Sequence, residues 1–256
     1  MTAKRLIFTL LYDSGSFMLS RNFRLQRVGN LKWLEENYGF NEVGSAIDEL
    51  IVLDVSRQSR NIEQFCEDLK LLTLDCFAPI AAGGGIRSLE HARLLLRSGA
   101  DKVVVNTAIH DQPELVDELG KKFGAQCIVA SIDCEHVNAE FVATKKNGFE
   151  LTSLKLADVA NICEQLPIGE ICLNSIARDG TGNGLHLEML DHLPANVTMP
   201  LIMMGGVGNS KHVVEGLRDA RVDAVATANL LNFMGDGLIR ARKNVIDEGI
   251  DLTKFD

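Results

Sequence analysis

Aromatic side chains are scarce in this sequence: they make up 5% of its 256 residues, although 46% of the residues are hydrophobic. The core must therefore be built from aliphatic side chains, as is usual for parallel strands that are buried on both faces. This composition favours an α/β fold over a β-sandwich. We expect one domain spanning 1–256, because α/β barrels commonly run about 200 to 250 residues as a single domain.

Positive charge is also in deficit, since 26 Lys and Arg are outnumbered by 35 Asp and Glu and the net charge is −9. Nucleic acids and anionic membranes recruit proteins mainly through clustered Lys and Arg, so we expect neither as a partner. Any anionic ligand must be held by a local arrangement of donors.

The six cysteines show no CxxC spacing, which argues against a zinc site and against a secreted disulfide framework. No metal and no cofactor is expected. The apolar run near the N-terminus lacks a small-residue cleavage site and soon meets Asp13, so it is neither a signal peptide nor a membrane span. We expect a cytoplasmic protein.

Short runs rich in Val and Ile alternate with segments of helical periodicity along the whole chain. The candidate strands cover 5–11, 49–55, 79–86, 101–106, 126–133, 169–176, 200–206 and 224–231. Strand followed by helix, eight times, predicts a closed (β/α)₈ TIM barrel, with an open doubly wound sheet as the main competitor. One of the expected helices is a short one over 185–193.

The two halves of the sequence repeat each other at a shift of 122 residues, which superposes Gly83-Gly84 on Gly205-Gly206 and Ser88 on Ser210. Two (β/α)₄ half-barrels would give the fold a pseudo-twofold axis. Matched loops would then lie on opposite sides of one mouth, an arrangement that suits a ligand with two anionic ends.

Two segments depart from the regular alternation. The long connection 13–30 carries Arg21, Arg24 and Arg27, and is interpreted either as a mobile lid that meets anions or as a solvated loop. Near 139–153, alternating residues flank Asn147-Gly148, which predicts a small β-hairpin inserted after the fifth strand.

Glycine-rich loops follow the third and seventh strands, as AAGGGIRS and MMGGVGNS, and each opens a helix. Backbone N–H groups at such helix N-termini are favourable phosphate donors, although glycines also serve tight turns. One strand later come Asn106-Thr107 in the first half and Ala228-Asn229 in the second. The pattern predicts two phosphate sites, one in each half.

Side chains at the C-terminal ends of barrel strands are candidates for acid–base chemistry or substrate binding. Asp54 and Asp133 end strands two and five, and Asp179 follows strand six; for each, a cap or turn role is the alternative. At the other end, charged residues open four strands and either remain solvated or form a salt-bridged plug. They are Arg5, Glu49, Lys102 and Glu170.

Several longer motifs resemble the cyclase subunit HisF of imidazole glycerol phosphate synthase, among them KFGAQCIVASID, GEICLNSIARDGT and MMGGVGN. The resemblance runs from AKRLI to the eighth strand. It implies a barrel that receives ammonia from a partner glutaminase, HisH, through its axis. It assigns phosphate contacts to Gly84, Asn106, Thr107, Gly206, Ala228 and Asn229, an ammonia gate to Arg5, Glu49, Lys102 and Glu170, and a glutaminase-facing carboxylate to Asp101.

The chain departs from that family at the catalytic end. Leu11 stands where the family has an acid–base Asp, Leu19 replaces a loop lysine, and Ala177 replaces an Asp, whereas Asp133 remains. Loss of one general acid or base typically lowers the rate by about 10² to 10⁴. We therefore expect the cyclase reaction to be lost.

LNSIARDG and LDVSRQSRN resemble a branch of HisF-like proteins associated with surface polysaccharides, which implies conversion of an acetamido to an acetamidino group on an amino sugar. The implied partners are a HisH-like glutaminase, an N-acetyl sugar amidotransferase and a phosphorylated or nucleotide-linked sugar. Two alternatives stand beside it. One is a genuine cyclase of histidine biosynthesis, with Asp133 acting beside Asp13 or Asp179; the other is a non-catalytic scaffold that conducts ammonia.

Overall fold

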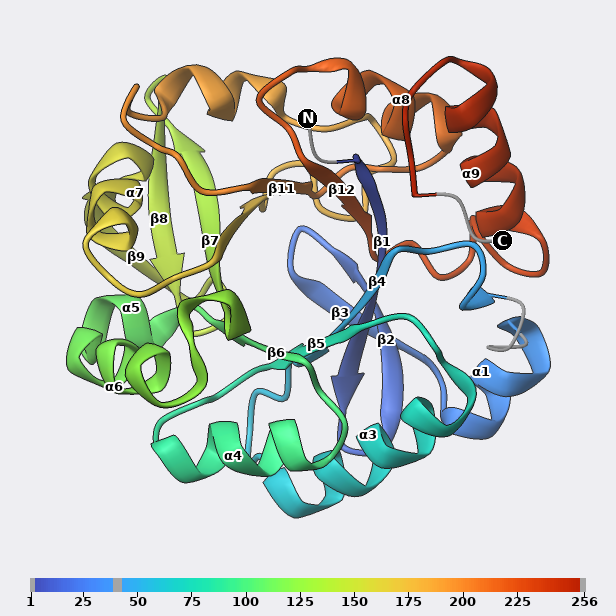
Figure 1. Cartoon of the computed structure of the whole chain (residues 1–256), viewed down its shortest axis with the longest axis horizontal. Coiled ribbons are helices and arrows are strands. Elements are labelled where there is room, and N and C mark those ends of the chain that lie inside the picture. The colour runs from blue at the N-terminus through green and yellow to red at the C-terminus, as the bar shows by residue number, and fades with distance from the viewer. Residues whose placement is uncertain (1–2, 39–42, 254–256) are drawn as a thin grey trace.

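Eight parallel strands close into a barrel in the computed structural model, which describes residues 3–38 and 43–253 (Figure 1). Neighbouring strands pair in parallel, and pairing of β12 with β1 and of β7 with β10 completes the ring. The strands are β1 (Arg5–Asp13), β4 (Glu49–Asp54), β5 (Ile80–Gly83), β6 (Lys102–Val105), β7 (Ile128–Val137), β10 (Glu170–Ser175), β11 (Leu201–Met204) and β12 (Ala224–Thr227). The predicted α/β barrel is confirmed, and an open sheet is excluded.

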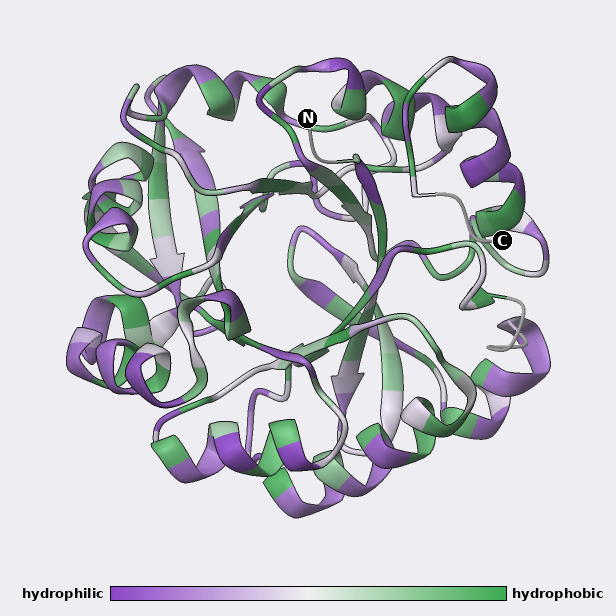
Figure 2. Cartoon of the chain, in the orientation of Figure 1, coloured by the Kyte–Doolittle hydropathy of each residue, from purple (hydrophilic) through white to green (hydrophobic). Residues whose placement is uncertain are grey.

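Helices surround the barrel and bury their apolar sides against it, while the strands themselves are mainly hydrophobic (Figure 2). They are α1 (Leu31–Tyr38), α3 (Ile62–Asp75), α4 (Leu89–Arg97), α5 (Thr107–Asp111), α6 (Pro113–Phe123), α7 (Leu156–Glu164), α8 (Ser210–Arg218) and α9 (Gly237–Asp247). The described residues also include two 3₁₀ helices, η1 (Ala125–Cys127) and η2 (Leu187–His192). The helix expected over 185–193 is thus reduced to a 3₁₀ segment.

Alternation along the strands separates the core into two parts. On β1 the even-numbered residues from Leu6 to Leu10 pack under the helices, whereas Ile7 belongs to a second cluster inside the barrel. That inner cluster fills the bore with small and branched side chains. Its buried members are Ile7, Ile51, Ala81, Val104, Val129, Cys172, Ile202, Met204, Ala224 and Ala226.

Strands β1 and β7 run beyond the barrel and each turns back into an antiparallel hairpin. The first consists of β2 (Ser16–Arg21) and β3 (Arg24–Gly29), and the second of β8 (Glu140–Lys145) and β9 (Glu150–Lys155). The segment 13–30, interpreted from the sequence as a lid or a solvated loop, is therefore a hairpin. Its turns use the left-handed conformation at Ser14-Gly15 and at Asn22-Phe23. Glycine and asparagine favour this conformation, whereas Phe23 adopts it without such a preference.

The two hairpins match across the half-barrel repeat. Leu11 lies opposite Met18 of β2, and Asp133, which is 122 residues later, lies opposite Thr144 of β8. The duplication therefore includes the β2–β3 and β8–β9 hairpins as well as the barrel strands. It places Leu11 and Asp133 at equivalent positions of the mouth.

A buried ion pair ties the last helix to the base of the barrel. Both guanidinium ends of Arg242 on α9 contact Asp48, at 2.9 and 3.1 Å, and the two side chains are only 9% and 4% exposed. Arg218 and Glu248 form a comparable pair that is 58% and 46% exposed. Arg242 also donates to the carbonyls of Ala46 and Thr253, so the two pairs differ in burial and in the number of hydrogen bonds.

We expect Arg242→Ala to lower the free energy of unfolding by about 3–5 kcal/mol, because it leaves the Asp48 carboxylate buried without its partner. Arg218→Ala is the matched control and should lower it by about 0–1 kcal/mol. Urea denaturation of the purified chain at neutral pH measures both. Equal losses for the two variants would contradict the assignment.

Candidate functional site

Two cavities open at the mouth formed by the C-terminal ends of the barrel strands. The larger has a volume of about 790 Å³ and lies over the first half-barrel, and the smaller has about 260 Å³ and lies over the second. Ser20, Asp179 and Met204 line both cavities. The β2–β3 hairpin therefore crosses the mouth and divides it.

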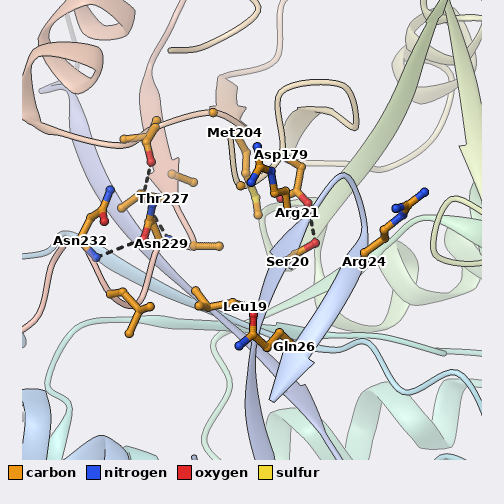
Figure 3. Close-up of a pocket in the computed structure, with 17 residues that line it drawn as sticks. Leu19, Ser20, Arg21, Arg24, Gln26, Asp179, Met204, Thr227, Asn229 and Asn232 are labelled. Carbon is orange, nitrogen blue, oxygen red and sulfur yellow. Dashed lines mark hydrogen bonds between the residues drawn. The ribbon is translucent and has the colours of Figure 1, made fainter. Parts of the chain in front are cut away.

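The predicted phosphate residues separate between these cavities. Gly84, Asn106 and Thr107 line the larger one together with Asp54. Gly206, Ala228 and Asn229 line the smaller one, together with Arg21 and Arg24 of the hairpin. Figure 3 shows the two arginines on the opposite side of this cavity from Asn229. Both sets of predicted phosphate residues thus lie at the mouth. Of the three arginines in the segment 13–30, Arg27 lines neither cavity.

Close backbone approach explains the glycines at the centre of both loops. A Cβ on Gly84 would come within 2.1 Å of the carbonyl oxygen of Asp54, and a Cβ on Gly206 within 2.1 Å of that of Gly184. Both residues also have left-handed φ angles, of +108° and +100°. Their turn role is therefore established, and at these two positions the cavity wall consists of backbone alone.

Side chains of the first half are engaged in contacts of their own. Asp54 accepts a hydrogen bond from Ser56 N at 2.9 Å and lies 3.7 Å from Arg60 Nε, and burial raises its pKa. The Thr107 hydroxyl accepts from Lys146 N at 3.1 Å. Asp54 therefore serves the loop after β4, and Thr107 fastens the tip of the β8–β9 hairpin.

Asp133 lies at the floor of the larger cavity between two amides. Asn106 Nδ2 and Asn174 Nδ2 each donate to its carboxylate at 3.1 Å. Burial, together with repulsion from Asp179, nevertheless raises the pKa of Asp133 to about 6. A carboxyl group with this pKa exchanges protons near neutral pH, as a general acid or base must.

Asp179 fixes the first hairpin across the mouth. Its carboxylate accepts from the Ser20 hydroxyl and from Phe23 N, the latter at 3.0 Å, and its backbone carbonyl accepts from Asn22 N at 2.9 Å. Burial raises the pKa of Asp179. This docking is absent from the sequence pattern, because it joins residues about 157 positions apart that share no motif.

The three positions that differ from the HisF pattern lie in different surroundings. Leu11 is 5% exposed and lines the larger cavity, and Leu19 lines the smaller one. Ala177 is exposed and lines neither cavity, so its replacement does not empty either of them. Asp13, considered as a substitute acid, does not line the larger cavity either.

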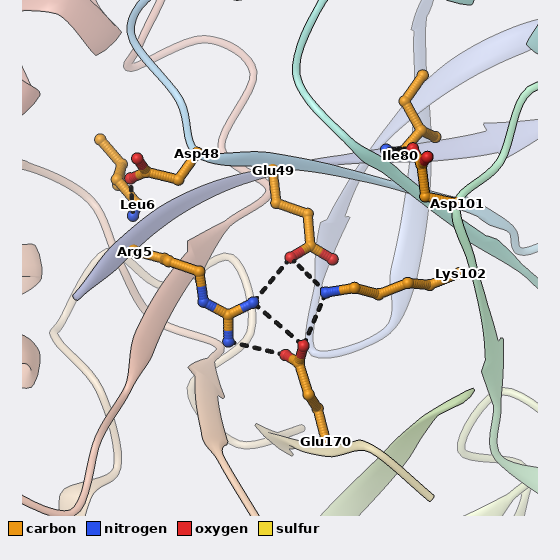
Figure 4. Close-up of polar contacts among 8 residues, drawn as sticks. All are labelled: Arg5, Leu6, Asp48, Glu49, Ile80, Asp101, Lys102 and Glu170. Atoms are coloured by element: carbon orange, nitrogen blue, oxygen red, sulfur yellow. Dashed lines mark hydrogen bonds and ion pairs between the residues drawn. The ribbon is translucent and has the colours of Figure 1, made fainter. Parts of the chain in front are cut away.

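At the opposite end of the barrel the four charged strand starts form a closed ring (Figure 4). Arg5 lies 2.9 Å from Glu49 and 2.7 Å from Glu170, and Lys102 lies 2.9 Å and 2.7 Å from the same two carboxylates. Burial tends to raise the pKa of both acids. Contacts with Arg5 and Lys102 outweigh this effect at Glu170 and lower its pKa. The pKa of Glu49 stays raised.

Asp101 lies beside this ring, and its carboxylate accepts from Ile80 N at 2.8 Å (Figure 4). Asp48 and Asp223 make the same contact at the starts of β1 and β11, through Leu6 N at 2.7 Å and Leu201 N at 2.9 Å. One oxygen of Asp101 therefore has a structural role that recurs around the base of the barrel.

Within residues 3–38 and 43–253, no group of three or more His, Cys, Asp and Glu side chains is arranged to hold a metal ion. Among the same residues, no helix combines the length and the apolar character needed to cross a membrane.

The pKa of Asp133 can be measured directly by carbon-13 NMR titration of the carboxyl groups. We expect a value of about 6, so that the group is protonated below this pH and ionised above it, where its burial destabilises the fold. Asp179→Asn should lower the pKa by removing a negative charge, and Asn174→Ala should raise it by removing a donor. Asp111→Asn, at the cavity edge, is the control and should leave it unchanged; a wild-type value near 4 would contradict the assignment.

Comparison with known proteins agrees with this architecture. The model of the family described as "Histidine biosynthesis protein" matches residues 40–235. A protein of Parasynechococcus marenigrum named "Putative imidazole glycerol phosphate synthase subunit hisF2" is 46% identical over 95% of this chain and 90% of its own length.

Proteins named imidazole glycerol phosphate synthase subunit HisF are similar over almost the full length. That of Corynebacterium glutamicum is 36% identical and that of Chlorobium limicola 33%, each across 98% of this chain and at least 98% of the relative. The chain therefore belongs to the histidine biosynthesis protein family, and within it to the HisF family.

Proposed function

We propose that this chain is a HisF-type synthase subunit that receives ammonia from a HisH-like glutaminase through the barrel and delivers it for acetamidino modification of a surface-polysaccharide amino sugar. The observation that carries the proposal is the combination of an intact charged ring at the base with a buried Leu11 at the mouth. The base suits ammonia entry, and the mouth lacks one of two equivalent acids. The substrate would be a phosphorylated or nucleotide-linked sugar, acted on with an N-acetyl sugar amidotransferase.

The bore above the ring is suited to a small neutral amine. An apolar layer of Ile7, Ile51, Val104 and Cys172 follows the charges, and it opposes passage of hydrated ions because desolvating a charge is unfavourable. Above it, three buried oxygens lack any hydrogen-bond donor: Thr9 Oγ1, Asn106 Oδ1 and Asn174 Oδ1. Buried acceptors are normally satisfied, so these mark positions where ammonia N–H groups would find partners.

The chemistry at the mouth differs from a two-acid cyclase. Asp133 has proton-exchange capacity near neutral pH, but its equivalent in the other half-barrel is Leu11, which cannot carry a proton. Ring closure in a cyclase requires a proton to be removed at one end of the substrate and supplied at the other. With leucine at position 11, the mouth lacks one of the two acid–base residues for these transfers. Conversion of an acetamido to an acetamidino group replaces the amide oxygen by the ammonia nitrogen and releases the oxygen as water. Activation of that oxygen falls to the partner amidotransferase, so the barrel needs only to deliver ammonia.

A second candidate is a genuine cyclase of histidine biosynthesis, and one observation favours it. Asp179 lines both cavities and has a raised pKa, and its charge contributes to the raised pKa of Asp133, so the mouth still holds two carboxyl groups. The names of the HisF relatives agree with this reaction. Experiments on the intact chain separate the two functions.

The first experiment tests ammonia transfer. The full chain should copurify with a HisH-like glutaminase of its own genome and raise the rate of glutamine hydrolysis by on the order of tenfold. Asp133→Asn should leave complex formation and this activation intact while product formation falls; unchanged product formation would make the barrel a scaffold that only conducts ammonia. Failure of both copurification and activation would remove the proposed function.

The second experiment tests cyclase activity by rescue of a histidine auxotroph that lacks its own cyclase subunit. We expect no growth with the wild type and growth with Leu11→Asp, because that change restores a carboxyl group opposite Asp133 in the same mouth. Ala177→Asp is the matched control and should not support growth, since position 177 lines neither cavity. Growth with the soluble wild-type protein would establish the cyclase instead.

A further inference from the structure

Three of the six histidines of this chain gather around one phenylalanine. His136 stacks on the ring of Phe141 with 4.8 Å between the ring centres, and His186 and His192 meet that ring almost at right angles, at 4.7 and 5.0 Å. The rings of His136 and His186 also contact each other, with centres 5.4 Å apart. None of these four residues lines either cavity, so the histidine cluster is separate from the site at the mouth.

The histidine cluster joins chain segments that hold both hairpins. Its rings come from β7 and β8, which pair in the second hairpin, from η2, and from the loop 176–186 between β10 and η2. His186 is the last residue of that loop, which also carries Asp179. Because Asp179 fastens the first hairpin across the mouth, the loop connects the cluster with the first hairpin.

The hydrogen bonds of His186 suit a neutral ring. Its Nδ1 lies 2.9 Å from the hydroxyl oxygen of Ser175 and its Nε2 lies 3.6 Å from a carboxylate oxygen of Glu188, while His186 and Ser175 are only 8% and 1% exposed. A neutral ring with its proton on Nε2 accepts the Ser175 hydroxyl proton and directs its own N–H towards Glu188. Protonation adds an N–H at Nδ1, so the buried hydroxyl loses its acceptor, which is unfavourable.

The charges around His186 also oppose its protonation. Burial lowers the pKa of His186 and the charge of Arg178 lowers it further, whereas Glu188 raises it from a side chain that is 76% exposed. His136 is exposed to solvent, and charging it places a second positive charge beside the His186 ring. The contact between these two rings is therefore stable only while at least one of them is neutral.

His192 is the member of the cluster that can carry a charge at little cost. Its Nδ1 lies 3.8 Å from a carboxylate oxygen of Glu140, which Lys155 contacts at 2.9 Å through the other oxygen. A positive His192 therefore has a carboxylate partner. The pH sensitivity of the cluster rests on His186 and His136.

We propose that the histidine cluster is a pH-sensitive clasp for the mouth. With His186 neutral, the cluster holds the loop 176–186 against the second hairpin; with His186 charged, the loop loosens, Asp179 loses its position and the first hairpin releases the mouth. Because the pKa of His186 is lowered in the folded chain, the clasp contributes its full stabilisation above about pH 6.5, the ordinary pKa of histidine, and loses it as the pH falls through the lowered value. The mouth is thus closed at neutral pH and opens in acid, whichever reaction it performs.

Amide hydrogen exchange of the full chain, followed by NMR between about pH 7.5 and about pH 5.5, tests the clasp. The reporters are the amides of Asn22 and Phe23, which donate to Asp179 when the first hairpin is docked. We expect their protection, after correction for the intrinsic pH dependence of exchange, to fall by on the order of tenfold over this range. His186→Gln cannot take up a proton and should abolish the fall, whereas the matched control His91→Gln, on α4, should retain it.

Ser175→Ala tests the same hydrogen bond with every histidine in place. Without the hydroxyl donor the neutral ring loses a partner, so the pKa of His186 should rise and the fall in protection should move to higher pH. The titration of the imidazole Cε1 proton, followed by NMR on the same samples, measures this pKa. Thermal unfolding of each variant verifies that it is folded.

Protection of Asn22 and Phe23 that does not change with pH would overturn the clasp. A fall that persists unchanged in His186→Gln would assign the pH dependence to the carboxyl group of Asp179, whose own pKa is raised, and would overturn the clasp as well. So would a Ser175→Ala variant in which protection falls at the same pH as in the wild type. Ammonia transfer and cyclase rescue are measured separately, so none of these results decides between the proposed functions.

Discussion

Closure of the parallel sheet is the constraint on which the rest of this structure depends. Because residues alternate between the two faces of a strand, a closed barrel commits every second side chain to a narrow axis, where no water can replace a missing partner. Four strand starts bring Arg5, Glu49, Lys102 and Glu170 to one level of that axis, and only mutual pairing makes their burial tolerable. The same alternation directs the side chains of Leu11 and Asp133 into the mouth at the other end of the barrel.

Duplication of the half-barrel makes the two halves of the mouth similar. The residues that differ between equivalent positions are the ones that matter for function. The glycine loops, the hairpins and the strand ends all recur, yet one half has Asp133 where the other has Leu11. The cavities are unequal as well: Phe23 and Phe149 line the larger, whereas no aromatic residue among those described lines the smaller. Because Asp133 and Leu11 occupy equivalent positions of one conserved scaffold, the difference between them changes the chemistry of the mouth without changing the fold.

The hairpins convert an open mouth into an enclosed one. Asp179 holds the first hairpin by three hydrogen bonds, and Thr107 and Asn147 hold the tip of the second against the barrel loops. Enclosure lowers the local dielectric and is the main cause of the raised pKa of Asp133. Any substrate that enters the mouth must displace or fit beneath these tips, so the hairpins contribute to selectivity as well as to shape.

The strands, the barrel and the positions of the glycine loops could be predicted from the sequence, because hydrophobic periodicity and turn chemistry are local properties. Several residues that line the mouth could be predicted as well, since strand ends in a closed barrel share one face. The tertiary structure was needed to show that 13–30 is a hairpin docked on Asp179, that Ala177 lies outside both cavities, and that Arg57 contacts the Phe23 carbonyl and the Phe149 ring. These outcomes depend on contacts between residues far apart in the chain, whose geometry exists only after the sheet has closed.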